Sequence, residues 1–190
     1  MMVRTLDRDV DVAIEAAVLA LLSEQGFARV TIEAVARAAG VGKPAIYRRF
    51  SDKAALVAHV IARQLPALEA PDLGDSRTEL WQAVEQGLPA DGPGYVRLIG
   101  GLIAEQDRHP ELIDAFRRTI LLPRRAIVRS IIERGQARGE IRRDIDPDAG
   151  LELMAGPFLA RVFAGLDTGQ HWRKAAFETW WDILRERKSR

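Results

Sequence analysis

The chain has 190 residues and a formal net charge of +1, and 47% of its residues are hydrophobic. This much apolar surface excludes a disordered chain, because burying it offsets the entropy lost on folding. The absence of cysteine excludes disulfides and thiolate metal sites and favours a reducing, cytoplasmic compartment. The longest unbroken apolar run is 16–22, far below the roughly 20 residues of a membrane span, so we expect no membrane association.

The positive charge is concentrated in one short segment near the N-terminus. Residues 37–53 carry five basic side chains against one acidic side chain, Asp52. The rest of the chain is nearly neutral. A short basic element on a neutral body is typical of a small surface that binds a polyanion.

Apolar residues at spacings of three and four predict four helices in the first 65 residues. The first ends near Gln25, because Gly26 accepts a left-handed conformation. The second has Thr31 as its N-cap. The third covers about 43–49, with Pro44 in its first turn, and Asp52 caps the fourth.

The segment 66–76 holds two prolines and a glycine and predicts a boundary between domains at 1–65 and 66–190. The sequence therefore predicts an all-α chain of about nine helices, in which a three- to four-helix N-terminal domain precedes a larger antiparallel helical bundle. The long helix near 110–138 contains Pro123, which should kink or split it. Beyond the boundary, helices are expected near 76–88, 95–107, 110–138, 147–165 and 171–187.

The second and third helices are joined by a tight turn, and such a pair forms a helix-turn-helix when the helices around it brace it. The segment 31–57 resembles the N-terminal domain of the tetracycline-repressor-like (TetR) family of bacterial transcription regulators. The resemblance covers about residues 10–61. It rests on Gly26-Phe27, Thr31, Ala36, Ala39-Gly40-Val41, Ile46-Tyr47, Phe50 and Lys53. Family members commonly have Ser or Thr where Gly42 stands.

The resemblance implies a set of residues that contact double-stranded DNA. Lysine and arginine can donate to guanine in the major groove, and we expect this of Lys43 and of Arg48 or Arg49. The alternative is that these arginines form a solvated helix face and that Tyr47 is an amphipathic core residue. The groove-facing positions are Lys43, Pro44, Ala45, Arg48 and Arg49, and the phosphate-contacting positions are Thr31, Tyr47 and Lys53.

The last two expected helices are apolar on more than one face, which requires partners on more than one side. A second copy of the chain is the simplest partner, and a homodimer also doubles the DNA contacts. The alternative is that helices of the same chain cover both faces. The expected dimer residues are Leu159, Val162, Phe163, Leu166, Phe177, Trp181 and Leu184.

The resemblance implies that the larger domain senses a ligand, and an apolar effector pocket is therefore expected among its helices, although ordinary core packing is the alternative for each of its residues. Its candidate residues are Leu65, Trp81, Leu98, Leu102, Phe116, Ile120, Met154 and Phe158.

No catalytic, metal or cofactor site is expected, because His59, His109 and His171 lie far apart in the sequence without paired ligands. Together with the resemblance, the sequence predicts a repressor that binds a palindromic operator as a homodimer and is released by an unknown small molecule. Two alternatives stay open. One is a DNA-binding protein without an effector, and the other is a helical small-molecule-binding protein or enzyme with a vestigial helix-turn-helix.

Overall fold

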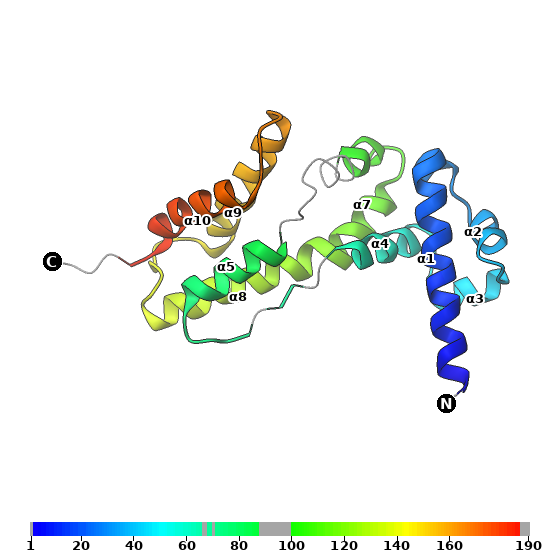
Figure 1. The fold of residues 1–190 in the computed structure, drawn as a ribbon, viewed down its shortest axis with the longest axis horizontal. Helices are drawn as coiled ribbons and strands as arrows, with labels where there is room; N and C mark the ends of the chain where they lie inside the picture. The colour runs from blue at the N-terminus through cyan, green and yellow to red at the C-terminus, as the bar shows by residue number, and fades with distance from the viewer. Residues whose placement is uncertain (1, 66–67, 70, 88–99, 187–190) are drawn as a thin grey trace. The chain divides into compact units, whose positions relative to one another are not determined.

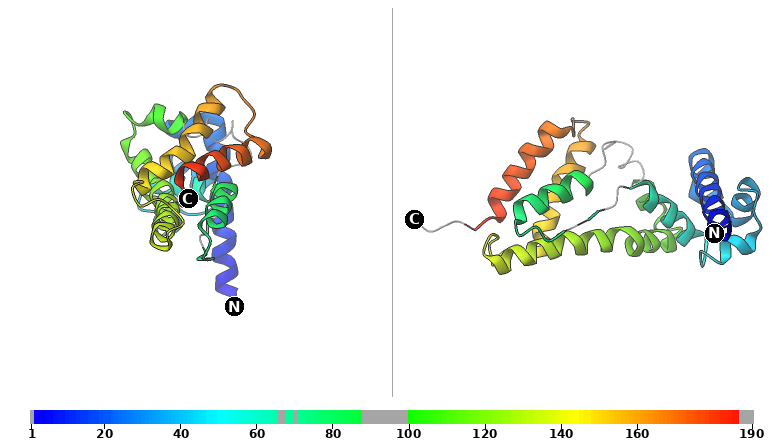
Figure 2. Two further views of the ribbon diagram at one scale, coloured as in Figure 1. Left: turned by 90° about the vertical axis from the view of Figure 1, so that its left-hand side faces the viewer. Right: turned by 60° about the horizontal axis from the view of Figure 1, so that its bottom comes forward.

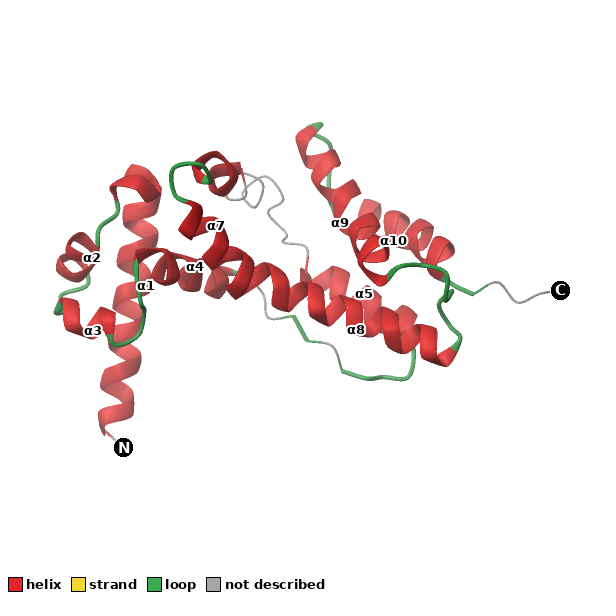
Figure 3. Cartoon of the chain, turned by 180° about the vertical axis from the view of Figure 1, so that it is seen from behind, coloured by secondary structure: helices red, strands yellow, loops and turns green. Residues whose placement is uncertain are grey.

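The computed structural model describes residues 2–65, 68–69, 71–87 and 100–186, and these are helical almost throughout (Figures 1 and 3). They contain nine labelled α-helices, a further helical stretch at 100–105 and no strand apart from one isolated antiparallel bridge between Ile141 and Arg185, which confirms the all-α prediction. The chain divides into two compact units. The first is Met1–Gln64 with Ala104–Ile120, and the second is Leu65–Ile103 with Leu121–Arg190.

The first unit is built around α1 (Met2–Arg29), with α2 (Ile32–Ala38) and α3 (Lys43–Tyr47) on one side and α4 (Lys53–Gln64) on the other (Figure 1). A fifth helix, α7 (Pro110–Phe116), packs on α4. The core of the first unit is made of side chains from all five helices, including Ile14, Val18, Val35, Ile46, Leu56, Val60, Leu112 and Phe116.

Local signals in the sequence produce the predicted boundaries in this unit. Gly26 has φ +71°, and the helical turns that continue to Arg29 follow this kink. The hydroxyl oxygen of Thr31 accepts from the amide of Ala34 at 3.1 Å and caps α2. Because these effects act within three or four residues, they can be predicted without knowing the fold.

The second unit contains α5 (Ser76–Gly87), α8 (Leu122–Arg138), α9 (Pro147–Phe163) and α10 (Gln170–Leu184). In Figures 1 and 2, α5 runs beside α8. The indole N–H of Trp180 donates to the carbonyl of Gly150 at 2.8 Å, which ties α10 to α9. The core includes Leu80, Ala83, Val84, Val128, Ile131, Ile132, Ile141, Leu151, Phe177, Trp180 and Leu184.

The long helix expected over 110–138 is interrupted, as Pro123 predicts. Residues Arg117–Leu121 form a π-helical turn between α7 and α8. Proline has no N–H to donate and its ring clashes with the preceding turn, so a wider turn relieves both problems.

The boundary between the two units falls at the end of this turn, and residues 104–120 lie with the first unit. Residues 100–105 are helical, and the rest of the expected helix up to residue 99 lies outside the described residues.

A fully buried carboxylate, Glu79, holds α5 against α8. It accepts from the guanidinium of Arg134 at 2.7 Å, from that of Arg138 at 3.3 Å and from the amide of Leu73 at 3.0 Å. A buried charge is tolerated only when it is paired and hydrogen-bonded, and Glu79 meets both conditions.

Gly135 on α8 packs so closely that it leaves no room for a methyl group. A Cβ there would lie 2.3 Å from Oγ of Ser76 and 2.6 Å from Cδ1 of Ile141. We expect Gly135→Ala to lower the free energy of unfolding, since overpacking of about 1–3 kcal/mol outweighs a helix-propensity gain of at most about 1 kcal/mol. Denaturant unfolding measures the change. At Gly101, which is also helical, a Cβ meets nothing within 4 Å, so Gly101→Ala should instead be stabilising.

Candidate nucleic-acid interface

The third helix, α3, is attached to the first unit through one buried side chain. Ile46 is 0% exposed and is the only residue of α3 that is fully buried. Gly42 precedes the helix without a side-chain cap, and its carbonyl accepts from the amide of Ala45 at 2.9 Å. This attachment leaves the opposite face of the helix to solvent.

The exposed face of α3 carries the predicted DNA-contacting groups. Lys43, Pro44, Tyr47 and Arg48 are exposed, Tyr47 to 53%, and Ala45 is half-buried. Two cationic side chains, a phenol and small apolar groups are thus exposed together along α3 and its C-terminal end. These groups match the acceptors, phosphates and thymine methyl groups that a major groove presents.

Lys43 forms an ion pair with Glu33 of α2, with 2.9 Å between Nζ and Oε1. The hydrogen bond from Lys43 lowers the pKa of Glu33, and the same bond raises the pKa of Lys43. Both side chains are more than half exposed. Solvent screening makes such pairs weak, so the ammonium of Lys43 can exchange Glu33 for a DNA acceptor.

Arg49 has different surroundings from its neighbour Arg48. Its Nε donates to Oδ1 of Asp11 on α1, its Nη1 donates to the carbonyl of Ala45 at 3.0 Å, and its side chain is only 18% exposed. The expectation that Arg49 reads a base stays a prediction.

Lys53, the first residue of α4, contacts the end of α1. Its Nζ donates to the carbonyl of Phe27 at 3.1 Å and lies 4.1 Å from the centre of the Phe27 ring. Burial lowers the pKa of Lys53. The edge of the Phe27 ring in turn meets His109 at 5.0 Å between ring centres. The ammonium therefore also has an internal partner, which the sequence did not indicate, and its phosphate contact stays a prediction.

Thr31 and Asp52 fix the starts of the helices that flank α3. Because the Thr31 hydroxyl accepts in its cap, its own proton remains available to a phosphate. Asp52 accepts from the amide of Ala55 at 2.8 Å and from the hydroxyl of Ser51 at 2.8 Å. These two hydrogen bonds lower the pKa of Asp52, the one from Ala55 most.

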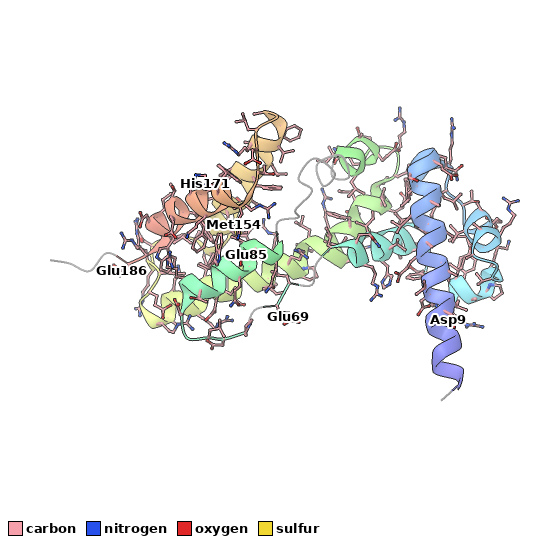
Figure 4. The ribbon with its side chains drawn as sticks, in the orientation of Figure 1. Asp9, Glu69, Glu85, Met154, His171 and Glu186 are labelled. Atoms are coloured by element: carbon pink, nitrogen blue, oxygen red, sulfur yellow. The ribbon has the colours of Figure 1, made fainter. Side chains whose placement is uncertain are left out.

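The expected effector residues divide between the two units. Phe116 and Ile120 are buried in the first unit, and Leu98 lies outside the described residues. A small cavity of about 30 Å³ lies between α5, α9 and α10 of the second unit, and Met154, labelled in Figure 4, is one of its lining residues. The remaining expected effector residues of the second unit, which do not line this cavity, are Leu65, Trp81, Leu102 and Phe158.

The expected dimer residues also fall into two groups. Phe177 and Leu184 lie in the core of their own unit, so they are below any surface on which a partner packs. Phe163 is 77% exposed and Leu166 is 53% exposed. Leu159, Val162 and Trp181 are half-buried.

The three-helix arrangement of α1, α2 and α3 with a cationic outer face defines a helix-turn-helix DNA-binding protein. A family model described as "Bacterial regulatory proteins, tetR family" matches residues 14–60, and one described as "Tetracyclin repressor-like, C-terminal domain" matches residues 70–179. The chain therefore belongs to the TetR family of transcription regulators, and it is a DNA-binding regulator rather than an enzyme.

Individual relatives agree with this assignment. An uncharacterized HTH-type transcriptional regulator of Bacillus subtilis (strain 168), YdeS, is 28% identical over 160 residues, which are 84% of this chain and 81% of YdeS. The flavonoid-responsive regulator FrrA superposes with a TM-score of 0.64 at 26% identity, covering 95% of this chain and 98% of FrrA. A TetR-family regulator from Rhodococcus sp. has the same fold, with a TM-score of 0.68 at 19% identity over 93% of this chain and 99% of that one.

None of the helices in residues 2–65, 68–69, 71–87 and 100–186 combines the length and the apolar character that a membrane crossing requires.

Tyr47→Phe tests the phosphate contact expected of the phenol. The ring keeps its place and only the exposed hydroxyl is lost, so the free energy of unfolding should stay unchanged. We expect DNA affinity to fall by about 0.5–1.5 kcal/mol, the net value of one hydrogen bond, equally for operator and random duplex. Fluorescence anisotropy with both duplexes measures this. A loss confined to one sequence would show that the hydroxyl contacts a base.

Proposed function

We propose that this protein is a ligand-responsive repressor that binds a palindromic operator as a homodimer through α3. The observation that carries the proposal is the exposed cationic face of α3, which projects Lys43, Tyr47 and Arg48 from the buried anchor Ile46. A helix held from one side in this way can enter a major groove with its polar side chains foremost.

Exposed apolar residues on α9, on α10 and in the loop between them support the homodimer. Phe163 at the end of α9 and Leu166 in the following loop are 77% and 53% exposed, and Ile183 near the end of α10 is 43% exposed. Large apolar side chains left exposed on neighbouring elements are typical of an interaction surface. Two-fold pairing there gives two recognition helices, and their symmetry matches a palindrome.

The cavity beside Met154 supports an effector that acts by changing conformation. Its volume of about 30 Å³ holds little more than a water molecule, so a larger ligand requires the surrounding side chains to move. A ligand that binds the moved state more tightly shifts the population away from the state that binds DNA. The relative FrrA is named for its response to flavonoids. The small volume also favours a second candidate, a regulator that binds its operator without an effector.

Selection of bound sequences from a random duplex library tests the proposal directly. The expected result is an inverted repeat whose half-site centres are separated by about 34–36 Å or a multiple of it. Enrichment of single half-sites would contradict the dimer, and the absence of any enriched sequence would contradict operator recognition.

Arg48→Ala should remove discrimination at particular base pairs of the selected operator, by about 1–3 kcal/mol each, because a base-reading arginine is lost. Affinities for single-base operator variants measure this. Arg108→Ala removes another exposed arginine from the same unit and serves as the matched control, which should leave the base preferences unchanged. An equal loss on every sequence would place Arg48 on a phosphate.

Phe163→Glu should dissociate the homodimer and weaken operator binding, because it places a charge in an apolar interface. Sedimentation velocity measures the oligomeric state. Leu73→Glu puts the same charge on a side chain that is 49% exposed outside α9 and α10, and it should remain dimeric. A Phe163→Glu protein that is still dimeric would move the interface elsewhere.

A further inference from the structure

Two adjacent arginines at the end of α3 are placed for different tasks. Arg48 is exposed, whereas Arg49 is largely shielded and contacts two different helices. Its Nε donates to Oδ1 of Asp11 on α1, and its Nη1 donates to the carbonyl of Ala45 in α3. One guanidinium therefore joins the C-terminal end of α3 to α1.

The recognition helix needs such a second attachment. It has five residues, no side-chain cap at Gly42 and one fully buried side chain, Ile46. A single apolar anchor fixes where the helix packs but fixes its rotation only weakly. The planar, forked guanidinium supplies directional bonds to both helices, and a lysine in its place cannot reproduce this geometry.

We propose that Arg49 is a positioning residue, and that its clasp with Asp11 sets the orientation in which Lys43 and Arg48 meet the bases. The proposal rests on the proposed function, in which α3 enters the major groove. It assigns base reading to Lys43 and Arg48 and an orienting task to Arg49.

The two ion pairs of α3 are not equivalent in this scheme. The Lys43–Glu33 pair is exposed on both sides and can open when DNA arrives. The side chain of Arg49 is 18% exposed and that of Asp11 is 49% exposed, so this pair is shielded on the arginine side, and in this scheme it persists in the complex.

The clasp predicts that neutralising Asp11 changes operator affinity in the direction opposite to that expected from charge repulsion alone. Removing an acidic group from a DNA-binding unit normally strengthens DNA binding, because repulsion of the phosphates is lost. If Asp11 orients α3 through Arg49, Asp11→Asn should instead weaken binding to the operator and leave binding to random duplex unchanged or stronger.

The experiment compares Asp11→Asn with Asp9→Asn in the full chain. Asp9 is an exposed acid on the same helix, labelled in Figure 4, and its removal changes the charge equally without touching Arg49. We expect operator affinity to fall roughly 3- to 10-fold for Asp11→Asn, because a neutral amide oxygen accepts from Arg49 more weakly than a carboxylate does, and not to fall for Asp9→Asn. Circular dichroism at the assay temperature confirms that each variant is folded.

Two further variants separate positioning from direct contact, and the first of them does not depend on the stability of Asp11→Asn. Arg49→Lys keeps the charge, so the salt dependence of binding should be unchanged while operator discrimination falls. When Arg49→Ala is combined with Asp11→Asn, the loss of affinity should be smaller than the sum of the two single losses, because both substitutions act on the same clasp.

Three results would overturn the inference. If Asp11→Asn behaves as Asp9→Asn while the wild-type chain is sequence-selective, the clasp is wrong and the proposed function stands. If Arg49→Ala reduces the salt slope by about one, Arg49 contacts a phosphate. A wild-type chain without sequence selectivity would overturn both the clasp and the proposed function.

Discussion

A helix of five residues has no stability of its own, because its first turn fixes several backbone dihedral angles in return for one hydrogen bond. The structure of α3 therefore depends on contacts from outside it. Burial of Ile46 supplies the apolar contact, and the amide of Val41, bonded to the carbonyl of Ala36 at 2.9 Å, shapes the turn that delivers it. Because the contacts that stabilise α3 lie on its buried side, the side chains on its exposed side are free to contact a ligand.

The parts of the fold that the sequence predicts are those set by neighbours along the chain. Gly26, Thr31 and Asp52 act on backbone groups within four residues, so their roles were visible in the printed sequence. The bonds of Lys53 to Phe27 and of Arg49 to Asp11 span 26 and 38 residues. Residue type indicated that these side chains could bind anions, but only the fold shows that both also bind α1.

The two compact units differ from the division expected from composition at residues 104–120, and the reason is related. A proline-rich segment indicates where one compact unit ends in the sequence. It does not indicate whether a later segment packs on that same unit. The helix α4 did contain a signal: its buried residues, among them Leu56, Val57 and Ala58, occupy successive positions and so cover more than one face. One neighbouring helix cannot cover them all, and α7 packs on α4 as an additional partner.

The π-helical turn at Arg117–Leu121 makes chain length a stricter requirement here than residue type. Its wider hydrogen-bonded ring accommodates one residue more than an α-helical turn. If one residue were deleted and an α-helix ran straight through, every residue after the deletion would move by one position in the helical repeat, a rotation of about 100°. Val128 and Ile131 are fixed in the core that α8 shares with α5, so the chain would have to absorb this rotation before it reaches them. A substitution in this turn changes one side chain. A deletion changes the direction of every side chain that follows it, so the number of residues in this turn is constrained more strongly than their identity.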